Sequence, residues 1–394
     1  MRTERIETVV VGGGQAGLAT GYHLARRGRS FVILDAGERI GDAWRKRWDS
    51  LRLFTPARYD SLPGLPFPGR SWSFPSAAEF ADYLRDYAAW CELPVRTGVF
   101  VRRLWHDGER YVVETAESAD DGSADRECRY EAENVVVAAG FDRLPKAPDF
   151  AADLAPDVVR LHAADYRGPA QLRDGDVLVV GAGNSGADIA LELSATHRVL
   201  LSGRHPGNLP WRIDSAAARV LSPLLFFAFR HVLTVRTPIG RKARPRILTQ
   251  SGPLIRVKSR DLAAAGVERV GRVMGVRDGQ PFFADGSDGS DGSDGSDGSG
   301  GGAARVANVV WCTGFAPDHS WIDLPVFGAD GEPRQRRGVV DAQPGLYFVG
   351  GLFQHSLSSS MVQGVGRDAG HVVEHLDARA GRVTRAARLT GARG

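Results

Sequence analysis

Two glycine-rich turns carry the residue types that hold the phosphates of a nucleotide. In the first turn, residues 12–17, Gly12 permits a sharp change of direction and Gly14 omits the Cβ that would block a pyrophosphate. Gly17 lets the following helix pack closely on the preceding strand. The start of that helix offers free N–H groups and the positive end of its dipole to phosphate oxygens. Asp35, 21 residues after Gly14, is placed to accept hydrogen bonds from an adenosine ribose, so this turn predicts a dinucleotide site.

The second turn, residues 181–186, has the same spacing, but its second strand ends differently. Its glycines and the two polar residues between them are Gly181, Gly183, Asn184, Ser185 and Gly186. Asn184 and Ser185 are within reach of the phosphates or of the nicotinamide. Where an NAD site places an acid, this chain has Ser202 and Arg204. A hydroxyl and a guanidinium suit a 2′-phosphate, so this turn predicts a preference for NADPH over NADH.

Each turn lies between two short apolar runs of the kind that form buried parallel strands, with a helical pattern after the turn. The ranges are 6–11, 18–27 and 30–34 around the first turn, and 176–180, 187–194 and 198–202 around the second. Two such units predict an α/β fold with two Rossmann-like dinucleotide-binding domains. A chain with two dinucleotide sites is suited to moving hydride from a nicotinamide to a flavin.

The composition argues against several other classes of function. The 394 residues carry 50 basic and 47 acidic side chains, and a net charge of +3 implies no strong field for nucleic acid. Cys91, Cys128 and Cys312 lie far apart without a CxxC pair, so we expect neither a metal site nor a dithiol redox centre. The low cysteine count, the charged N-terminus and the absence of an apolar run of about 18 residues predict a cytoplasmic protein without membrane contact.

These motifs together resemble those of the class B flavin-dependent monooxygenases, which include the flavin-containing monooxygenases and the plant YUCCA-type enzymes. The first turn is similar to their FAD fingerprint, and residues 41–45 are similar to the element beside the flavin ring. Residues 177–193 are similar to the NADPH-binding segment. Further similar segments are residues 51–56, 62–68, 311–315 and 345–350.

The resemblance implies an FAD-binding domain into which an NADPH-binding domain is inserted. We expect residues 1–165 and 312–394 to form the FAD-binding domain and residues 166–311 to form the NADPH-binding domain. The inserted domain contains a low-complexity segment, residues 285–302, with five Asp-Gly-Ser triplets followed by glycines. This segment cannot bury apolar area, so we expect a flexible surface loop.

The resemblance also implies which residues contact the cofactors. Trp44 is expected to pack close to the flavin ring, and the helix predicted at 359–376 is expected to point its N-terminus at the flavin. The residues implied to lie near the reacting atoms are Trp44, Asn184, Gln354 and His355. The implied cofactor-binding residues are Gly12, Gly14, Gln15, Ala16, Gly17, Asp35, Ala36, Gly41, Trp44, Gly140, Gly181, Gly183, Asn184, Ser185, Gly186, Ser202, Arg204, Thr313, Gly314, Gly350 and Gln363.

The implied reaction is that of an NADPH-dependent flavoprotein monooxygenase. NADPH reduces FAD, the reduced flavin takes up O₂ as a C4a-hydroperoxide, and one oxygen atom passes to a small, lipophilic substrate. The apolar residues 221–229 are expected to pack in the core, with a substrate entrance or a membrane contact as alternatives. The chain is expected to act as a monomer or a homodimer.

Some residues depart from the family pattern and keep two other functions open. Pro156 and Val158 replace the Phe and Gly of the family's identifying motif, which ends at His162. Near Phe54 and Thr55 the chain lacks the Asn that touches the oxygenated flavin in animal-type members. One alternative is therefore an NADPH oxidase or flavin reductase that releases H₂O₂. The other is a non-catalytic FAD- and NADPH-binding redox sensor linked to transport.

Overall fold

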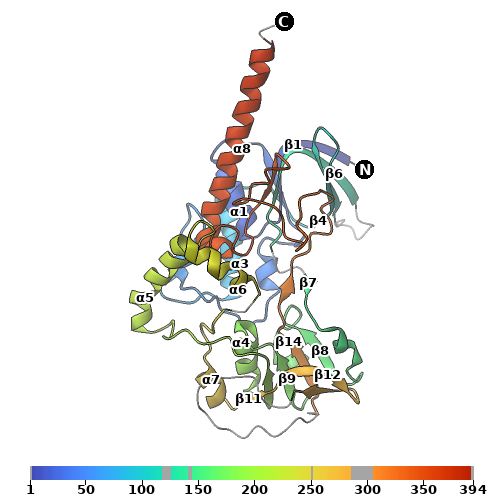
Figure 1. Ribbon diagram of the computed structural model, residues 1–394, viewed down its shortest axis with the longest axis vertical. Helices are drawn as coiled ribbons and strands as arrows, with labels where there is room; N and C mark the ends of the chain where they lie inside the picture. Colours follow the sequence, from blue (N-terminus) through green and yellow to red (C-terminus); the bar gives the residue numbers. More distant parts are fainter. Residues whose placement is uncertain (1, 118–125, 141–143, 250–251, 285–304, 392–394) are drawn as a thin grey trace.

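The computed structural model describes residues 2–117, 126–140, 144–249, 252–284 and 305–391. The chain forms two sheets, a larger one toward the end of the molecule that carries both termini and a smaller one at the opposite end (Figure 1). The fold class predicted from the two glycine turns is confirmed. The segment expected to be a flexible surface loop, residues 285–302, lies outside the described residues.

The larger sheet combines parallel strands with an antiparallel edge. Its order is β3-β2-β1-β6-β5-β4, and β16 pairs with the last part of β6. β1, β2, β3, β6 and β16 run parallel, whereas β5 and β4 continue the sheet in antiparallel pairs. The bounds are β1 Arg2–Val11, β2 Phe31–Leu34, β3 Val95–Arg96, β4 Val99–His106, β5 Tyr111–Glu117, β6 Arg126–Val137 and β16 Leu346–Phe348.

Both faces of the larger sheet are buried, because alternate strand residues enter different hydrophobic clusters. Val10 shares one cluster with Leu84 of α3 and Val372 of α8. Its neighbour Val9 shares the other cluster with Ile322. The helices on the first face are α1 Gln15–Ala25, α3 Ala77–Trp90 and α8 Val362–Gly391.

Helix α8 is longer than the sequence predicted. The expected helix ended at residue 376, with a frayed tail from residue 379, but α8 continues to Gly391 and extends beyond the sheet (Figure 1). Residues 377–391 include four alanines and four arginines, which have high helix propensity and favour continuation of the helix.

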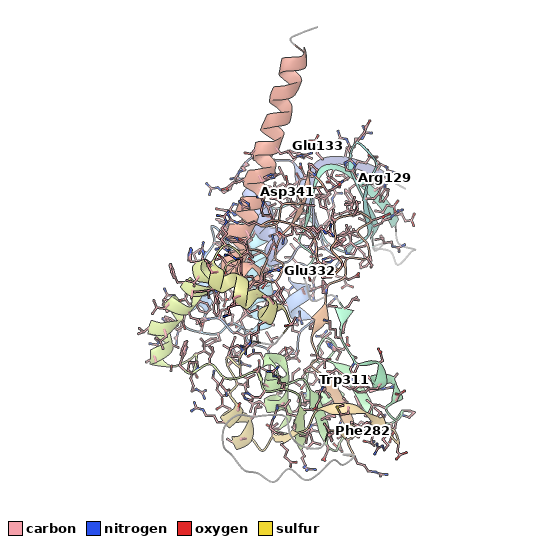
Figure 2. All side chains as sticks on the ribbon, viewed as in Figure 1. Arg129, Glu133, Phe282, Trp311, Glu332 and Asp341 are labelled. Carbon is pink, nitrogen blue, oxygen red and sulfur yellow. The ribbon has the colours of Figure 1, made fainter. Side chains whose placement is uncertain are left out.

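The smaller sheet is entirely parallel, in the order β11-β10-β9-β14-β8. The bounds are β8 Val159–His162, β9 Val177–Val180, β10 Val199–Ser202, β11 Glu268–Val270 and β14 Asn308–Trp311. Helices α4 Asn184–Leu193 and α7 Ser259–Ala264 and the hairpin of β12 Val273–Arg277 and β13 Gln280–Phe283 accompany this sheet. Figure 2 shows Trp311 and Phe282 here, far from Arg129 and Glu133 on the larger sheet.

Strand β8 corrects the predicted domain boundary. It falls within residues 1–165, which were assigned to the first domain, yet it pairs with β14 at the edge of the smaller sheet. The chain therefore enters the smaller sheet before residue 166. The short apolar run of β8 follows no glycine turn, so the sequence pattern that marked the other strands was missing.

Two adjacent segments connect the sheets. β7 Leu144–Pro145 and β15 Phe315–Ala316 pair in antiparallel fashion where the chain leaves and re-enters the larger sheet (Figure 1). A helical insert of α5 Ala216–Phe227, the π-helix η4 Ala228–Val232 and α6 Pro238–Thr249 follows β10. The remaining elements are α2 Asp42–Arg45, η1 Ala57–Tyr59, η2 Asp149–Asp153, η3 Pro169–Gln171 and η5 Leu357–Ser360.

Candidate functional site

The first glycine turn is sterically restricted at Gly12, Gly13 and Gly17 and open at Gly14. Gly12 has a φ of +106°, and a Cβ there would lie 2.5 Å from the carbonyl oxygen of Ala138. A Cβ at Gly17 would lie 1.8 Å from the carbonyl oxygen of Gly12. At Gly14, by contrast, a Cβ would meet no protein atom within 4 Å. The glycine at position 14 thus keeps space open beside the start of α1, as a bound pyrophosphate requires.

The start of α1 has unused hydrogen-bond donors. Its N-cap is Gly14, and no side chain caps the helix, so the first N–H groups remain available to an anion. Asp35, at the end of β2, accepts hydrogen bonds from the backbone N–H of Gly13 at 2.5 Å and of Gly37 at 2.7 Å. Each carboxylate oxygen retains a further acceptor position, which suits a ribose hydroxyl beside exposed Ala36.

The loop after β16 packs against this helix start. A Cβ at Gly350, where φ is +88°, would lie 2.9 Å from the Cβ of Ala16. The side-chain amide of Gln15 donates to the carbonyl oxygen of Ser360 at 2.9 Å. The structure therefore brings Gln15, Ala16 and Gly350 together, although they are far apart in the sequence. Gly140, with a φ of +76°, has open space around its missing Cβ.

The side-chain amide of Gln354 hydrogen-bonds to the backbone of the loop that follows β16. Its Nε2 donates to the carbonyl oxygen of Phe348 at 2.7 Å, and its Oε1 accepts from the N–H of Gly351 at 3.0 Å. Phe353, the residue before Gln354, is buried and has a φ of +49°, a left-handed conformation that is uncommon for a bulky residue. The side-chain amide of Gln363, in the first turn of α8, donates to Met361 Sδ at 3.7 Å. Gln354 thus uses its amide to hold the backbone of the loop.

His355 is buried in the same loop with an unpartnered ring nitrogen. Its backbone N–H donates to Ser359 Oγ at 3.0 Å, and its Nδ1 has no hydrogen-bond partner among the described residues. Burial lowers the pKa of His355 to about 4, and the positive charges of Arg337 and Arg367 add to this effect while Asp368 opposes it. The imidazole is therefore neutral near pH 7, with a nitrogen free to bind a ligand or a water molecule.

Trp44 lies on α2, whose N-cap Gly41 has a φ of +91° that brings the backbone against Ala81 of α3. The Trp44 ring is half-buried and meets the edge of the Phe80 ring, with the centroids 4.9 Å apart. This contact fixes one side of the indole. The placement of Trp44 beside a flavin remains a prediction.

Sequence reasoning missed a buried acid, Asp60. Its Oδ1 accepts a hydrogen bond from the Thr55 hydroxyl, and its Oδ2 has no hydrogen-bond partner among the described residues. Burial raises the pKa of Asp60 to about 7. The neighbouring Tyr59 ring packs 4.3 Å, centroid to centroid, from Phe226 of α5, so the helical insert adjoins this segment. The only sign of Asp60 in the sequence was an acidic residue within the largely apolar segment 51–68.

The second glycine turn repeats the steric construction of the first. A Cβ at Gly181, where φ is +109°, would lie 2.3 Å from the carbonyl oxygen of Cys312. A Cβ at Gly186 would lie 1.8 Å from the carbonyl oxygen of Gly181. Helix α4 starts at Asn184 after the N-cap Gly183, again without a side-chain cap. This helix start, with half-buried Ser185 in its first turn, also fits an anion.

Asn184 holds a distant segment over the start of α4. Its Nδ2 donates to the carbonyl oxygen of Pro253 at 3.1 Å, and its Oδ1 accepts from the N–H of Ile255 at 2.9 Å. Both ends of the amide therefore bond to the backbone of the chain. Nδ2 retains one further N–H for a ligand, so the predicted contact with the nicotinamide nucleotide stays a prediction.

The prediction that Ser202 contacts a 2′-phosphate is wrong. Ser202 is fully buried, its hydroxyl donates to the carbonyl oxygen of Gly271 at 2.8 Å, and it accepts from the N–H of Val273. Because side chains alternate between the two faces of a strand, that of Ser202 lies on a buried face of β10, where a phosphate at the protein surface cannot reach it. Arg204 is exposed just beyond the strand. Arg269 of β11 lies nearby, because it donates to the carbonyl oxygen of Gly203, and sequence reasoning missed it.

Thr313 and Gly314 lie where the two connecting segments meet. The Thr313 hydroxyl donates to the carbonyl oxygen of Lys146. The carbonyl oxygen of Gly314 accepts from the N–H of Lys146 at 3.0 Å and lies 3.1 Å from His162 Nε2. His162 is buried, and its other ring nitrogen accepts from the N–H of Ala164. These contacts hold the connection between the sheets, so His162 has a structural role here.

The amino-acid sequence matches the family described as "Pyridine nucleotide-disulphide oxidoreductase" over residues 9–229. A CzcO-like oxidoreductase of Geobacillus kaustophilus is 36% identical over 373 residues, covering 94% of this chain and 98% of that protein. The Arabidopsis thaliana protein named "Probable indole-3-pyruvate monooxygenase YUCCA3" is 29% identical over 386 residues, covering 90% of this chain and 85% of that protein.

The solved structures give the same assignment over both sheets. A mutant of a flavin monooxygenase from Stenotrophomonas maltophilia has a TM-score of 0.70 and 28% identity, covering 96% of this chain and 100% of that one. The chain belongs to the pyridine nucleotide-disulphide oxidoreductase family, within the group that contains the CzcO-like oxidoreductases and the flavin-dependent monooxygenases, and it is a flavoprotein oxidoreductase.

Proposed function

We propose that this chain is an NADPH-dependent FAD monooxygenase that uses O₂ to oxygenate a small, lipophilic molecule. The observation that supports this most is the repeated glycine turn. In both turns a helix start without a side-chain cap follows a glycine that approaches a neighbouring carbonyl, and Gly14 leaves open space beside the first helix. The likeness to the flavin monooxygenase from Stenotrophomonas maltophilia supports the same function.

The residues of the first turn fit the FAD pyrophosphate. The free N–H groups at the start of α1 would bind the phosphates, and Asp35 would accept from the ribose. The chemistry that bound FAD supplies is reduction by a nicotinamide followed by activation of O₂. Trp44 and the loop around His355 would exclude water from the flavin, and the neutral His355 ring would accept a hydrogen bond there.

The residues of the second turn fit NADPH. Arg204 lies just beyond the end of β10 and Arg269 lies within the adjacent strand β11, and these two guanidinium groups would bind a 2′-phosphate. Asn184 would keep the segment of Pro253 over the nucleotide and contact it with its remaining N–H.

Disulfide reduction, which the family's description includes, does not suit this chain. Cys91, Cys128 and Cys312 are all free thiols, and none is next to another in sequence. Burial raises the pKa of Cys312 to about 12, so its thiol is not a nucleophile at neutral pH.

An NADPH oxidase that releases H₂O₂ is a second candidate, and the Thr55–Asp60 contact favours it. The Thr55 hydroxyl already donates to the carboxyl group of Asp60, and residues 51–60 contain no asparagine or glutamine. A site with few donors would protect an oxygenated flavin poorly against loss of H₂O₂.

The cofactor assignment is tested with Gly14→Ala and Gly168→Ala. Both substitutions place a methyl group in open space, so both variants should fold. Only Gly14→Ala should weaken FAD binding, by about 100-fold or more, because the methyl occupies the pyrophosphate position. The measurements are the far-UV circular dichroism spectrum and FAD titration of the apoprotein. Equal FAD affinity of the two variants would contradict the assignment of the FAD pyrophosphate to the space beside Gly14.

The reaction itself is tested by stoichiometry. FAD-loaded protein reduced anaerobically with NADPH is exposed to air with and without candidate substrates, which include an alkyl aryl sulfide and indole-3-pyruvate. A monooxygenase forms one oxygenated product per NADPH and correspondingly less H₂O₂. One H₂O₂ per NADPH with every substrate identifies the oxidase. Failure of NADPH to bleach the flavin identifies the redox sensor instead.

A further inference from the structure

The helical insert carries an apolar helix face that is largely exposed, and among its side chains Phe227 contacts the His231 ring one turn further along, with the ring centroids 4.7 Å apart. Val220, Leu224 and Phe227 follow one another at helical spacing on α5 and are 70%, 65% and 59% exposed. Ile239, at the start of α6, is also largely exposed. We call Val220, Leu224, Phe227 and Ile239 the insert surface. The expectation that residues 221–229 pack in the core is therefore wrong for this face.

The opposite face of α5 packs against the rest of the protein and holds the helix in place. Ala218, Ser222 and Phe226 are buried, and the Phe226 ring contacts the Tyr59 ring. The helix begins at Ser215, whose side chain accepts from the N–H of Ala218 at 3.2 Å. Because these contacts fix α5, the insert surface is not needed for folding, and its exposure calls for another explanation.

The charge of the insert is strongly biased. Residues 216–249, which make up the insert, contain seven arginine and lysine side chains and no aspartate or glutamate. The whole chain carries a net charge of only +3, so the rest of the chain is net acidic. Exposed basic side chains flank the insert surface on both helices: Arg219 on α5, and Arg241, Lys242 and Arg246 on α6.

We propose that the insert surface docks on an anionic lipid bilayer, with the apolar side chains of α5 entering the headgroup region and the basic residues contacting lipid phosphates. Aliphatic and aromatic residues on one helix face with surrounding arginine and lysine are the combination that binds such an interface. This surface contact replaces the sequence-based expectation that the chain avoids membranes. Within the described residues no helix is long and apolar enough to cross a bilayer, so the contact is with one leaflet only.

Other partners fit these observations less well. A symmetric dimer through this surface would place two insert regions, each with a large positive charge, against each other. Nucleic acid would satisfy the arginines but leave Val220 and Leu224 without apolar contact. An anionic bilayer satisfies both kinds of side chain at once.

The test is co-flotation of the FAD-loaded full chain with vesicles. We expect binding to vesicles that contain phosphatidylglycerol and much weaker binding to phosphatidylcholine alone. The double variant Leu224→Glu/Phe227→Glu should lose at least about 10-fold in affinity for the anionic vesicles. Phe100→Glu/Met274→Glu is the matched control, because it alters two similarly exposed apolar residues outside the insert. Retained flavin absorbance and an unchanged thermal transition show that each variant is folded.

The basic residues are tested separately with Arg241→Gln/Lys242→Gln. Removal of each charge should weaken binding to anionic vesicles about fivefold, and added salt should weaken binding of the unmodified chain. Equal binding to both kinds of vesicle, or no binding to either, would overturn the proposal. Dimerisation in light scattering that the Leu224→Glu/Phe227→Glu variant abolishes, without vesicle binding, would assign the surface to a second copy of the chain instead.

Discussion

The two glycine turns share their steric construction and differ in what surrounds them. In each, the third glycine approaches the carbonyl oxygen of the first so closely that a Cβ would lie 1.8 Å from it. After the first turn, β2 ends in Asp35, which bonds to the turn itself. After the second, β10 is followed by Gly203, with a φ of +126°, and exposed Arg204. The shared part fits a pyrophosphate, and we propose that the different part selects which ribose is bound.

The first residues of α1 and α4, Gln15 and Asn184, each hydrogen-bond to the backbone of a segment far away in the sequence, but the two segments differ. Gln15 donates to Ser360 in the loop before α8, whereas Asn184 bonds at both ends to the segment of Pro253 and Ile255. Each amide therefore holds a distant piece of chain over its own turn. The covering loop in the first site contains His355, and the covering segment in the second follows the helical insert in the sequence.

The buried acids of the two regions differ in their charge partners. Asp188 of α4 lies 3.2 Å from Arg256, which opposes the raising of its pKa by burial. Asp60, beside the larger sheet, has only the Thr55 hydroxyl as a hydrogen-bond partner among the described residues. A buried acid without a cation is costly when ionised, so Asp60 is a feature that folding alone would not favour.

Gly17→Ala and Gly186→Ala test whether the two regions act independently. Both insert a methyl group onto a carbonyl oxygen, so each should disrupt its own turn. Gly17→Ala should abolish FAD binding and the folded state of the larger domain. Gly186→Ala should keep the visible flavin spectrum but lose anaerobic reduction by NADPH. Loss of the flavin in Gly186→Ala as well would show that the regions fold as one unit.

Asp60→Asn and Asp188→Asn should change stability to different extents, because only Asp188 has a cation beside it. Folded Asp60 keeps its proton up to about pH 7, whereas the unfolded chain releases it near pH 4. Its ionisation therefore destabilises the fold increasingly as pH rises through this range. At pH 8, Asp60→Asn should raise the free energy of unfolding by roughly 2–4 kcal/mol, and this gain should vanish near pH 4.

Asp188→Asn should change the free energy of unfolding at pH 8 much less, because Arg256 offsets part of the burial that raises the pKa of Asp188 and loses its ion-pair partner in the variant. Urea denaturation at pH 4, 6 and 8 measures both variants. A pH-independent effect of Asp60→Asn would contradict the assignment of a buried, unpaired carboxyl.

Arg204→Ala tests the different ends of the two turns. Loss of a charged hydrogen bond to a 2′-phosphate should raise the KM for NADPH about 10- to 100-fold and leave the KM for NADH unchanged. Arg198→Ala is the control, because Arg198 lies at the other end of β10 and pairs with Asp176 and Glu268. Equal increases for both nucleotides would show that Arg204 does not read the phosphate.

Asn184→Ala and Gln15→Ala compare the two covering contacts. Asn184 makes two hydrogen bonds and Gln15 one, so the variants should lose about 2 and about 1 kcal/mol of stability. Hydrogen exchange of the Ile255 N–H should accelerate in Asn184→Ala alone. Unchanged exchange at Ile255 would mean that other contacts hold this segment.

Much of this site was visible in local sequence because its constraints are local. Gly12, Gly14 and Gly17 are required by atoms within one turn, and Asp35 follows at the end of the next strand. Ser202 failed as a prediction because strand alternation, rather than distance along the sequence, decides which face a side chain occupies. Asp60 was missed because burial depends on the insert and the helices that surround it.

The sequence by itself determined the two glycine turns, since backbone geometry there depends on residues a few positions apart. Only the tertiary structure placed β8 in the smaller sheet, brought Gly350 against Ala16 and put Arg269 beside Gly203. It also decided that one face of α5 is buried and the other exposed. These outcomes depend on packing between segments far apart in the chain, for which a single sequence carries no local signal.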